Sequence, residues 1–162
     1  MAEFSKEINS KFPNQRIKAL LNVKFTANYF DTLGNDYLKP FKISEQQYNI
    51  LRILRGAAPN PINAGTIKDR MVNPKSDVTR LMDRLVDKGF IDRKLRPDNR
   101  RQMHITISTK GLQILDKIAP LLSKLLENYQ DGLSDHKKVS EFLEYLYHIQ
   151  EQTNLIINPP NE

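Results

Sequence analysis

The fold is decided by residues 75–95, which read KSDVTRLMDRLVDKGFIDRKL. Five apolar residues in this stretch recur at the three- and four-residue spacing of one helix face: Val78, Leu81, Met82, Leu85 and Val86. Gly89 stands where a helix commonly ends in a left-handed residue, and Phe90 follows it directly. The stretch therefore predicts an amphipathic helix over 75–88 and a strand that begins at Phe90.

A basic hairpin is expected after this helix. Residues 102–107 alternate polar and apolar side chains, as a half-buried strand does. Pro97 and Asn99 favour a turn between residues 96 and 100, which would join this strand to the one over 90–95. Five basic residues lie at or near the tip of the hairpin: Arg93, Lys94, Arg96, Arg100 and Arg101.

Two further helix starts precede residue 75. Ser44 and Gln47 form the pattern of a capping box, which predicts a helix from there to Gly56. Asn63 is a suitable cap for a short helix from residue 64 to about Met71. Short helices joined by a tight turn and followed by a basic hairpin make a winged helix-turn-helix, here placed over residues 41–107.

Longer helices are expected on both sides of this part. The first would run from about Pro13 to Leu33, where the residues 34–36, Gly-Asn-Asp, interrupt it. Ser108 or Thr109 would cap a helix that Pro120 kinks or splits, and Ser134 would cap the last helix. The predicted fold is mainly α with a small β-hairpin wing, in one domain over residues 1–162. Residues 5–38 and 108–155 would be helical flanks, and residues 156–162 a disordered tail.

The charge points to a polyanionic partner. The chain of 162 residues has 25 lysines and arginines against 19 acidic residues, a formal net charge of +6. Eleven basic and six acidic residues lie between residues 68 and 101, so most of the excess gathers there. Such local concentration of positive charge favours nucleic acid, with a solvated basic face as the alternative.

Several other classes of function are disfavoured. The chain has no cysteine, which removes disulfides, thiolate metal sites and thiol chemistry. His104, His136 and His148 are scattered; Glu144 and His148 are four residues apart, for which an ordinary surface pair and a shared metal are the alternatives. No enzyme motif, cofactor or metal site is predicted, and no run of 18 apolar residues indicates a membrane span. The charged start, MAEFSKE, lacks a signal sequence, so a cytoplasmic protein is expected.

Four motifs in order resemble the MarR-type winged-helix transcription regulators. They are residues 43–51, ISEQQYNIL, residues 76–91, residues 98–101, DNRR, and residues 107–111, ISTKG. The first resembles the opening of the family's second helix and the second its recognition helix. The third is similar to the Asp-x-Arg of its wing, and the fourth to the start of its fifth helix. The resemblance covers roughly residues 15 to 150.

Nine residues are candidates for DNA contact: Lys75, Ser76, Thr79, Arg80, Arg84, Arg96, Asp98, Arg100 and Arg101. The first turn of the helix over 75–88 would reach base edges in the major groove, and the basic wing over 92–101 the backbone or minor groove. The resemblance implies that Arg100 enters the minor groove and that Asp98 orients its guanidinium. For Arg84, ion pairing with neighbouring aspartates is the alternative.

The resemblance also implies a homodimer that reads a pseudo-palindromic operator in double-stranded DNA, and a repressor relieved by a small aromatic or anionic effector. Residues 5–38 and 108–155 would then be dimerisation helices, with packing of their apolar residues inside one chain as the alternative. Tyr29, Tyr37 and Tyr48 would line the effector pocket, with plain core packing as the alternative. The competing function is a winged-helix module that binds protein without base readout. Five basic residues at the hairpin favour the DNA-binding regulator.

Overall fold

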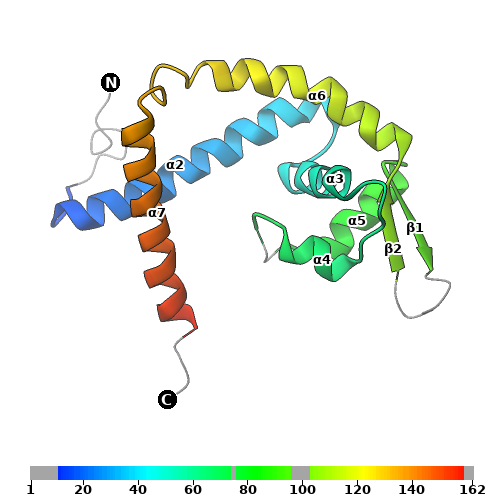
Figure 1. Ribbon diagram of the computed structural model, residues 1–162, viewed down its shortest axis with the longest axis horizontal. Helices are drawn as coiled ribbons and strands as arrows, with labels where there is room; N and C mark the ends of the chain where they lie inside the picture. Colours follow the sequence, from blue (N-terminus) through cyan, green and yellow to red (C-terminus); the bar gives the residue numbers. More distant parts are fainter. Residues whose placement is uncertain (1–10, 74–75, 96–102, 159–162) are drawn as a thin grey trace. The chain divides into compact units, whose positions relative to one another are not determined.

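The computed structural model describes residues 11–73, 76–95 and 103–158 (Figure 1). Its elements are, in order, α2 Gln15–Leu38, the 3-10 helix η1 Lys39–Phe41, α3 Glu45–Ala57, α4 Ala64–Asp69, α5 Val78–Asp87, β1 Ile91–Leu95, β2 Met103–Ile107, α6 Thr109–Glu127 and α7 His136–Ile157. The chain divides into two compact units, residues 1–118 and 119–162. The predicted fold class, mainly helical with a two-stranded wing, is confirmed.

The core of the first unit lies between α3, α4, α5 and the hairpin, which gather together in Figure 1. Helix α3 contacts α2, α4, α5 and β2, and α5 contacts β1. The side chains that fill this core are almost fully buried: Ile50, Leu51, Leu54, Ile67, Leu85, Ile91, Ile105 and Leu115. This packing holds the short helix α5 in place from three sides.

The predicted helix starts at α3 and α4 are confirmed. The Ser44 hydroxyl accepts a hydrogen bond from the Gln47 amide at 3.2 Å, and the Gln47 side chain accepts one from the Ser44 amide at 3.2 Å. The Asn63 side chain accepts from the Thr66 amide at 2.9 Å. These side chains satisfy backbone donors that have no partner inside a helix, which fixes where each helix begins.

Helix α5 begins later than expected. Asp77 is its N-cap and accepts a hydrogen bond from the Arg80 amide at 3.1 Å, so α5 starts at Val78 rather than residue 75. Gly89 ends it with a φ of +70°, as predicted. Val86, expected on the buried face, is 37% exposed. It lies about 80° around the helix from Val78, beyond the part of the face that meets the core.

The hairpin is antiparallel and pairs Ile91 with Ile107 and Arg93 with Ile105. Strand β1 begins at Ile91, one residue later than expected. Ile62, between α3 and α4, adds a bridge that the sequence did not indicate, because its amide and carbonyl both bond to Ile105, at 3.1 and 2.9 Å. The wing is thus attached to the helical part through the backbone as well as through its side chains.

Helix α6 starts in close contact with the base of the wing. Ser108 is the cap of the two expected: its hydroxyl accepts from the Gly111 amide at 3.0 Å and donates to the Gly89 carbonyl at 2.7 Å. A Cβ atom at Gly111 would lie 2.2 Å from the Phe90 carbonyl oxygen. The helix then continues through Pro120, so the expected split does not occur.

Helix α2 also differs from expectation. It begins after the cap Asn14, outside Pro13, and runs through residues 34–36 to Leu38. Two of those three residues, Gly34 and Asn35, have tertiary partners in α3, and the helix continues. A Cβ atom at Gly34 would lie 3.2 Å from the Glu45 carboxyl carbon, and the Asn35 side chain accepts from the Glu45 amide at 3.3 Å. Lys42, with a φ of 57°, ends the following turn.

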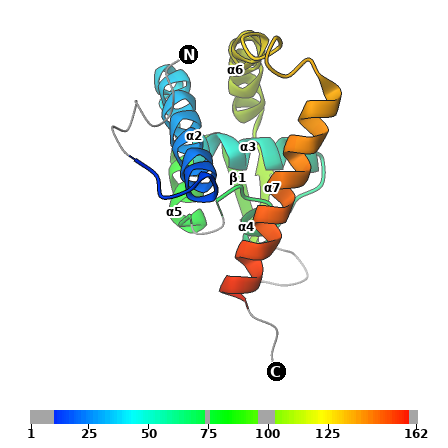
Figure 2. The same ribbon diagram turned by 90° about the vertical axis from the view of Figure 1, so that its left-hand side faces the viewer.

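Helix α7 in the second unit is a single uninterrupted helix (Figure 2). Its N-cap is Asp135 rather than Ser134, because the Asp135 carboxylate accepts from the amides of Lys137 and Lys138 at 3.1 and 3.2 Å. These bonds lower the pKa of Asp135. The helix extends to Ile157, so residues 156 and 157 are helical instead of part of a tail. Among the described residues, no helix combines the length and apolar character needed to span a membrane.

Candidate nucleic-acid interface

Four of the nine predicted DNA-contact residues lie in the part of the chain that the structure describes. Thr79, Arg80 and Arg84 are exposed on α5, and Ser76 is half-buried just before it. Ser76, Arg80 and Arg84 line a common hollow of about 240 Å³ together with Gln46 of α3. The other five, Lys75, Arg96, Asp98, Arg100 and Arg101, lie outside the described residues.

The arginines of α5 present their charges to solvent. Within the described part of the chain, neither Arg80 nor Arg84 forms an ion pair, including with the aspartates expected as alternative partners of Arg84. An exposed guanidinium without a carboxylate partner keeps its donors available for phosphate oxygens or base edges. This face of α5 can therefore bind an anionic surface without first breaking an internal salt bridge.

Arg93 has a different position from the one expected of a cation at the wing tip. Its Nη1 atom lies 2.6 Å from the Asp83 Oδ1 atom, and its Nη2 atom donates to the Thr79 carbonyl at 3.4 Å. The Arg93 side chain is 22% exposed, so this bond joins β1 to α5 in a partly buried place. Sequence reasoning missed this role, although the opposite charges of Asp83 and Arg93 on adjacent elements were a usable signal.

Lys88 makes a second connection that the sequence did not reveal. Its ammonium group donates to the Lys42 carbonyl and, at 3.3 Å, to the Gln47 side chain. Burial, and then the nearby Arg84 charge, lower the pKa of Lys88. Lys88 follows the last residue of α5, so these bonds tie the end of α5 to the start of α3. The C-terminal end of α5 is thus fixed relative to α3.

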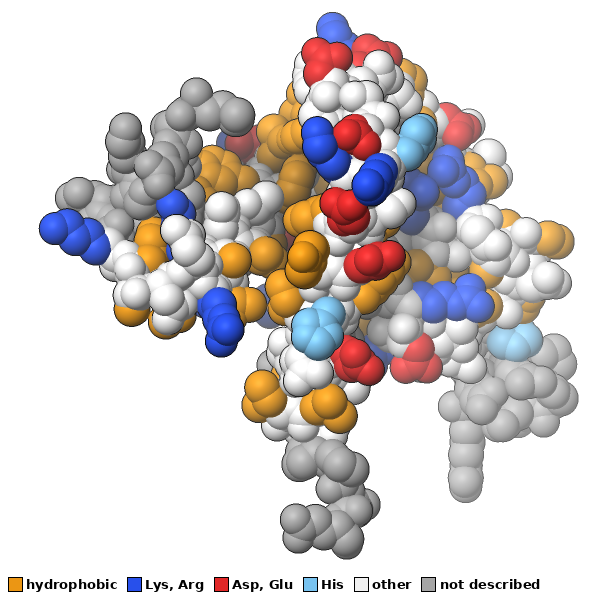
Figure 3. All heavy atoms as spheres, turned by 60° about the vertical axis from the view of Figure 1, so that its left-hand side comes forward, with side chains coloured by type: hydrophobic (Ala, Val, Ile, Leu, Met, Phe, Trp, Pro, Cys, Tyr) orange, Lys and Arg blue, Asp and Glu red, His pale blue; other side chains and the backbone are white. Residues whose placement is uncertain are grey.

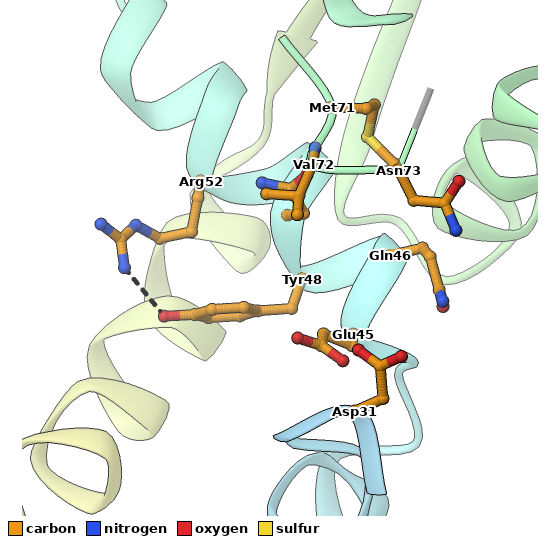
Figure 4. A pocket seen from close by; sticks show the side chains of 9 residues that line it. Asp31, Glu45, Gln46, Tyr48, Arg52, Met71, Val72 and Asn73 are labelled. Atoms are coloured by element: carbon orange, nitrogen blue, oxygen red, sulfur yellow. Dashed lines mark hydrogen bonds between the residues drawn. The ribbon is translucent and has the colours of Figure 1, made fainter. Parts of the chain in front are cut away.

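The three tyrosines predicted to form an effector pocket do not line one cavity together. Tyr48 lines a cavity of about 360 Å³, whose lining residues do not include Tyr29 or Tyr37 (Figure 4). Tyr29 is 57% exposed and packs edge-on against Phe25, with 4.9 Å between ring centroids. Among the described residues, no group of three or more His, Asp or Glu side chains is arranged to hold a metal ion.

A helix with an exposed polar and basic first turn, supported by a second helix and fastened to a β-hairpin, defines the winged helix-turn-helix class of DNA-binding proteins. Comparison with known proteins gives the family. The model of the MarR family matches residues 43–103, which span α3 to the start of β2. The resemblance to the MarR family is confirmed, and the comparisons support a DNA-binding transcription regulator.

Relatives extend the match beyond the winged helix. The multiple antibiotic resistance protein MarR of Escherichia coli is 29% identical, over 76% of this chain and 81% of that protein. The repressor YetL of Bacillus subtilis is 28% identical over 57% of this chain and 58% of its own length.

Solved structures agree. A MarR transcription factor from Planctomyces limnophilus is 28% identical, with a TM-score of 0.64 over 88% of this chain and 99% of that one. A mutant Escherichia coli MarR in complex with operator DNA is also 28% identical and has a TM-score of 0.64, over 91% of this chain and 97% of that one.

Proposed function

We propose that this regulator is a homodimeric repressor that reads a pseudo-palindromic operator in double-stranded DNA and is released by a small-molecule effector. The observation that carries the proposal is the first turn of α5, where Thr79 and Arg80 are exposed beside Ser76. An α-helix fits the major groove, where the base edges differ in hydrogen-bond donors and acceptors. Arg80 can donate to a guanine or a phosphate, and the hydroxyls of Ser76 and Thr79 to either.

The wing supplies the second contact in this proposal. Arg96, Arg100 and Arg101 lie on the connection between β1 and β2, and Arg93 binds Asp83 on α5. Because that ion pair attaches β1 to α5, a position of α5 in the major groove also sets where the wing meets the DNA. Arginine is favoured in a narrow minor groove, whose negative potential is high. Asp98 would orient Arg100 there.

The dimer rests on the terminal helices. The apolar side chains Leu20, Leu21 and Phe30 of α2 are between 42% and 51% exposed, and Phe142 and Leu143 of α7 are 54% and 42% exposed. Figure 3 shows hydrophobic side chains at the surface between charged ones on the face drawn there. Exposed apolar faces of this kind are typical of interfaces. A second copy of the chain would cover them and set two α5 helices about one DNA turn apart.

Several remaining features belong to the same proposal. Residues 41–107 would be the DNA-binding part, flanked by dimerisation helices, and the protein would act in the cytoplasm without a catalytic role. Some of the regulators that the chain resembles are named repressors, such as YetL and MprA. An effector would lower DNA affinity by favouring a half-site spacing that no longer matches the operator.

Selection of bound duplexes from a random-sequence pool tests the proposal. The full-length protein is expected to enrich a palindrome with half-sites about one helical turn apart. Arg80→Ala should then weaken binding to that sequence by about 1–3 kcal/mol, while Lys117→Ala on α6 should leave it unchanged. Arg100→Ala should weaken it to a similar degree. Binding without enrichment, or equal losses for Lys117→Ala and Arg80→Ala, would contradict base readout and favour the protein-binding module instead.

A further inference from the structure

The cavity of about 360 Å³ in the first unit has a chemistry that the proposed DNA contacts do not use. It lies between the end of α2, the first two turns of α3 and residues 71–73, which lead to α5. Figure 4 shows Asp31 and Glu45 close to each other on one side of the Tyr48 ring. Met71 and Val72 supply apolar surface on the opposite wall. A volume of this size is within the range of small-molecule sites.

Among the described residues, no cation pairs with the acidic end of the cavity. Within the described part of the chain, neither Asp31 nor Glu45 takes part in an ion pair. Burial and then the Asp31 charge raise the pKa of Glu45, as expected for two carboxylates that face each other. Glu45 is also packed against Gly34, whose missing side chain lets α2 approach its carboxylate.

The basic residue of the cavity is already engaged. The Arg52 Nη1 atom donates to the Tyr48 hydroxyl at 3.1 Å, and its guanidinium carbon lies 5.8 Å from the ring centroid. Arg52 is thus held at the hydroxyl end of Tyr48, and Asp31 and Glu45 lie at the other end of that ring (Figure 4). The lining carries two carboxylates against one guanidinium, so its formal charge is negative.

We propose that this cavity binds a small organic cation, a protonated amine on an aromatic or apolar body. The ammonium group would donate to the Asp31 and Glu45 carboxylates, in charge-assisted hydrogen bonds. The body would lie against Tyr48, Met71 and Val72, where the ring face also attracts positive charge. Of the aromatic or anionic effector expected from sequence, this chemistry disfavours the anionic kind, because an acid placed here would meet two carboxylates.

The cavity is connected to the DNA-contact face, and this step rests on the proposed function. The Val72 amide donates to the Asn49 side chain at 3.1 Å, and both residues line the cavity. The Ser76 amide donates to the Asn73 carbonyl at 3.2 Å, which links the wall of the cavity to the start of α5. Gln46 lines both this cavity and the hollow beside Arg80. A bound cation is therefore expected to lower operator affinity, as release by an effector requires.

Calorimetric titration of the full chain tests the site directly, without DNA. The probe is 1-naphthylmethylamine, and 1-naphthylacetate is its matched anion. The amine is expected to bind at least about tenfold more tightly than the acid, and Asp31→Asn and Glu45→Gln should each weaken it about tenfold. The control is Asp36→Asn, which removes a carboxylate on α2 that does not line the cavity and should change nothing. Circular dichroism confirms that each variant is folded, and Asp31→Glu should retain binding.

Two outcomes would overturn the site: equal or tighter binding of 1-naphthylacetate, or equal losses in Asp36→Asn and Asp31→Asn. The effect of the bound amine on DNA binding is measured separately, as operator affinity with and without the amine. If the amine binds and operator affinity is unchanged, the connection through residues 71–73 is wrong. If the chain binds no DNA in the absence of the amine, the proposed function fails while the titration still decides the cation site.

Discussion

Helices α5 and α7 are both amphipathic, yet the apolar side chains of α5 are mostly buried and those of α7 are not. In the ten residues of α5, Val78, Met82 and Leu85 are buried to 6% exposure or less. In the 22 residues of α7 no residue is buried, although Phe142, Leu143 and Ile156 are as apolar as those of α5. The periodic pattern that predicts a helix does not say which surface covers its apolar face.

The different burial of α5 and α7 means that the two helices are stabilised in different ways. The core face of α5 is buried within its own chain, where α5 contacts α3, α4 and β1. Helix α7, in the second unit, has no buried residue of its own. If a second copy covers it, the stability of α7 depends on protein concentration while that of α5 does not.

The largest effect is expected in the core beneath α5. Leu85 is fully buried, and Leu85→Ala should lower the free energy of unfolding by about 3 kcal/mol, through lost burial and a cavity. Val86→Ala on the exposed side of the same helix should cost less than about 1 kcal/mol. Urea denaturation at several protein concentrations measures both. Equal losses would mean that α5 is not held by its own chain in the way described.

A smaller effect is expected on α7. Leu143→Asp places a charge on the apolar face and should raise the dissociation constant of the dimer at least about tenfold, without loss of helix content. Sedimentation velocity over a range of protein concentrations measures the dissociation constant. Gln152→Asp adds the same charge at an exposed polar position and is the control. A dimer as tight as the original after Leu143→Asp would place the interface elsewhere.

Loss of the capping box of α3 should have a still smaller effect on stability, and this effect should be confined to the first unit. Ser44→Ala removes the acceptor for the Gln47 amide and should cost about 1 kcal/mol. Thermal unfolding measures it, and Ser44→Thr, which keeps the hydroxyl, should restore most of the loss. Because the cap is within the first unit, the cost should be the same at every protein concentration. A loss that varies with concentration would weaken the contrast between α5 and α7.

The smallest effect concerns pH. The pKa of Glu45 is raised in the folded protein, so the folded state holds its proton more tightly than the unfolded state does. Glu45 therefore does not lower the free energy of unfolding at a pH below its pKa in the unfolded state. It lowers that free energy increasingly as the pH rises through its pKa in the folded state. Glu45→Gln should accordingly raise the melting temperature slightly at pH 7, and the gain should vanish in acid. A gain in melting temperature that is larger in acid than at pH 7 would contradict this prediction.

Local chemistry allowed the winged part of the fold to be predicted well. Ser44 with Gln47, Asn63 and Gly89 act through their own neighbours in the chain, and each prediction at these residues is confirmed. The errors occur where distant residues decide. Residues 34–36 would end an isolated helix, but Gly34 and Asn35 meet Glu45 of α3, and α2 continues.

Competition between neighbouring caps explains one further error. Asp135 lies next to Ser134, the cap that the sequence predicted, and hydrogen-bond geometry selects Asp135. The site was harder to predict for a related reason. Arg93 belongs to the basic run of the wing by sequence, yet its partner Asp83 comes from another element. Charge counts show how many cations a segment has, whereas pairing depends on how strands and helices are placed.

Gly111 has a consequence for how this sequence can vary. Any side chain there would meet the Phe90 carbonyl oxygen at 2.2 Å and an Ile107 side-chain carbon at 2.8 Å, whereas a Cβ at Gly56, also in a helix, would have no atom within 4 Å. If both codons were randomised and folded protein were recovered, codon 56 should return many amino acids and codon 111 almost only glycine. The junction between wing and α6 would thus tolerate far fewer substitutions than Gly56 near the end of α3.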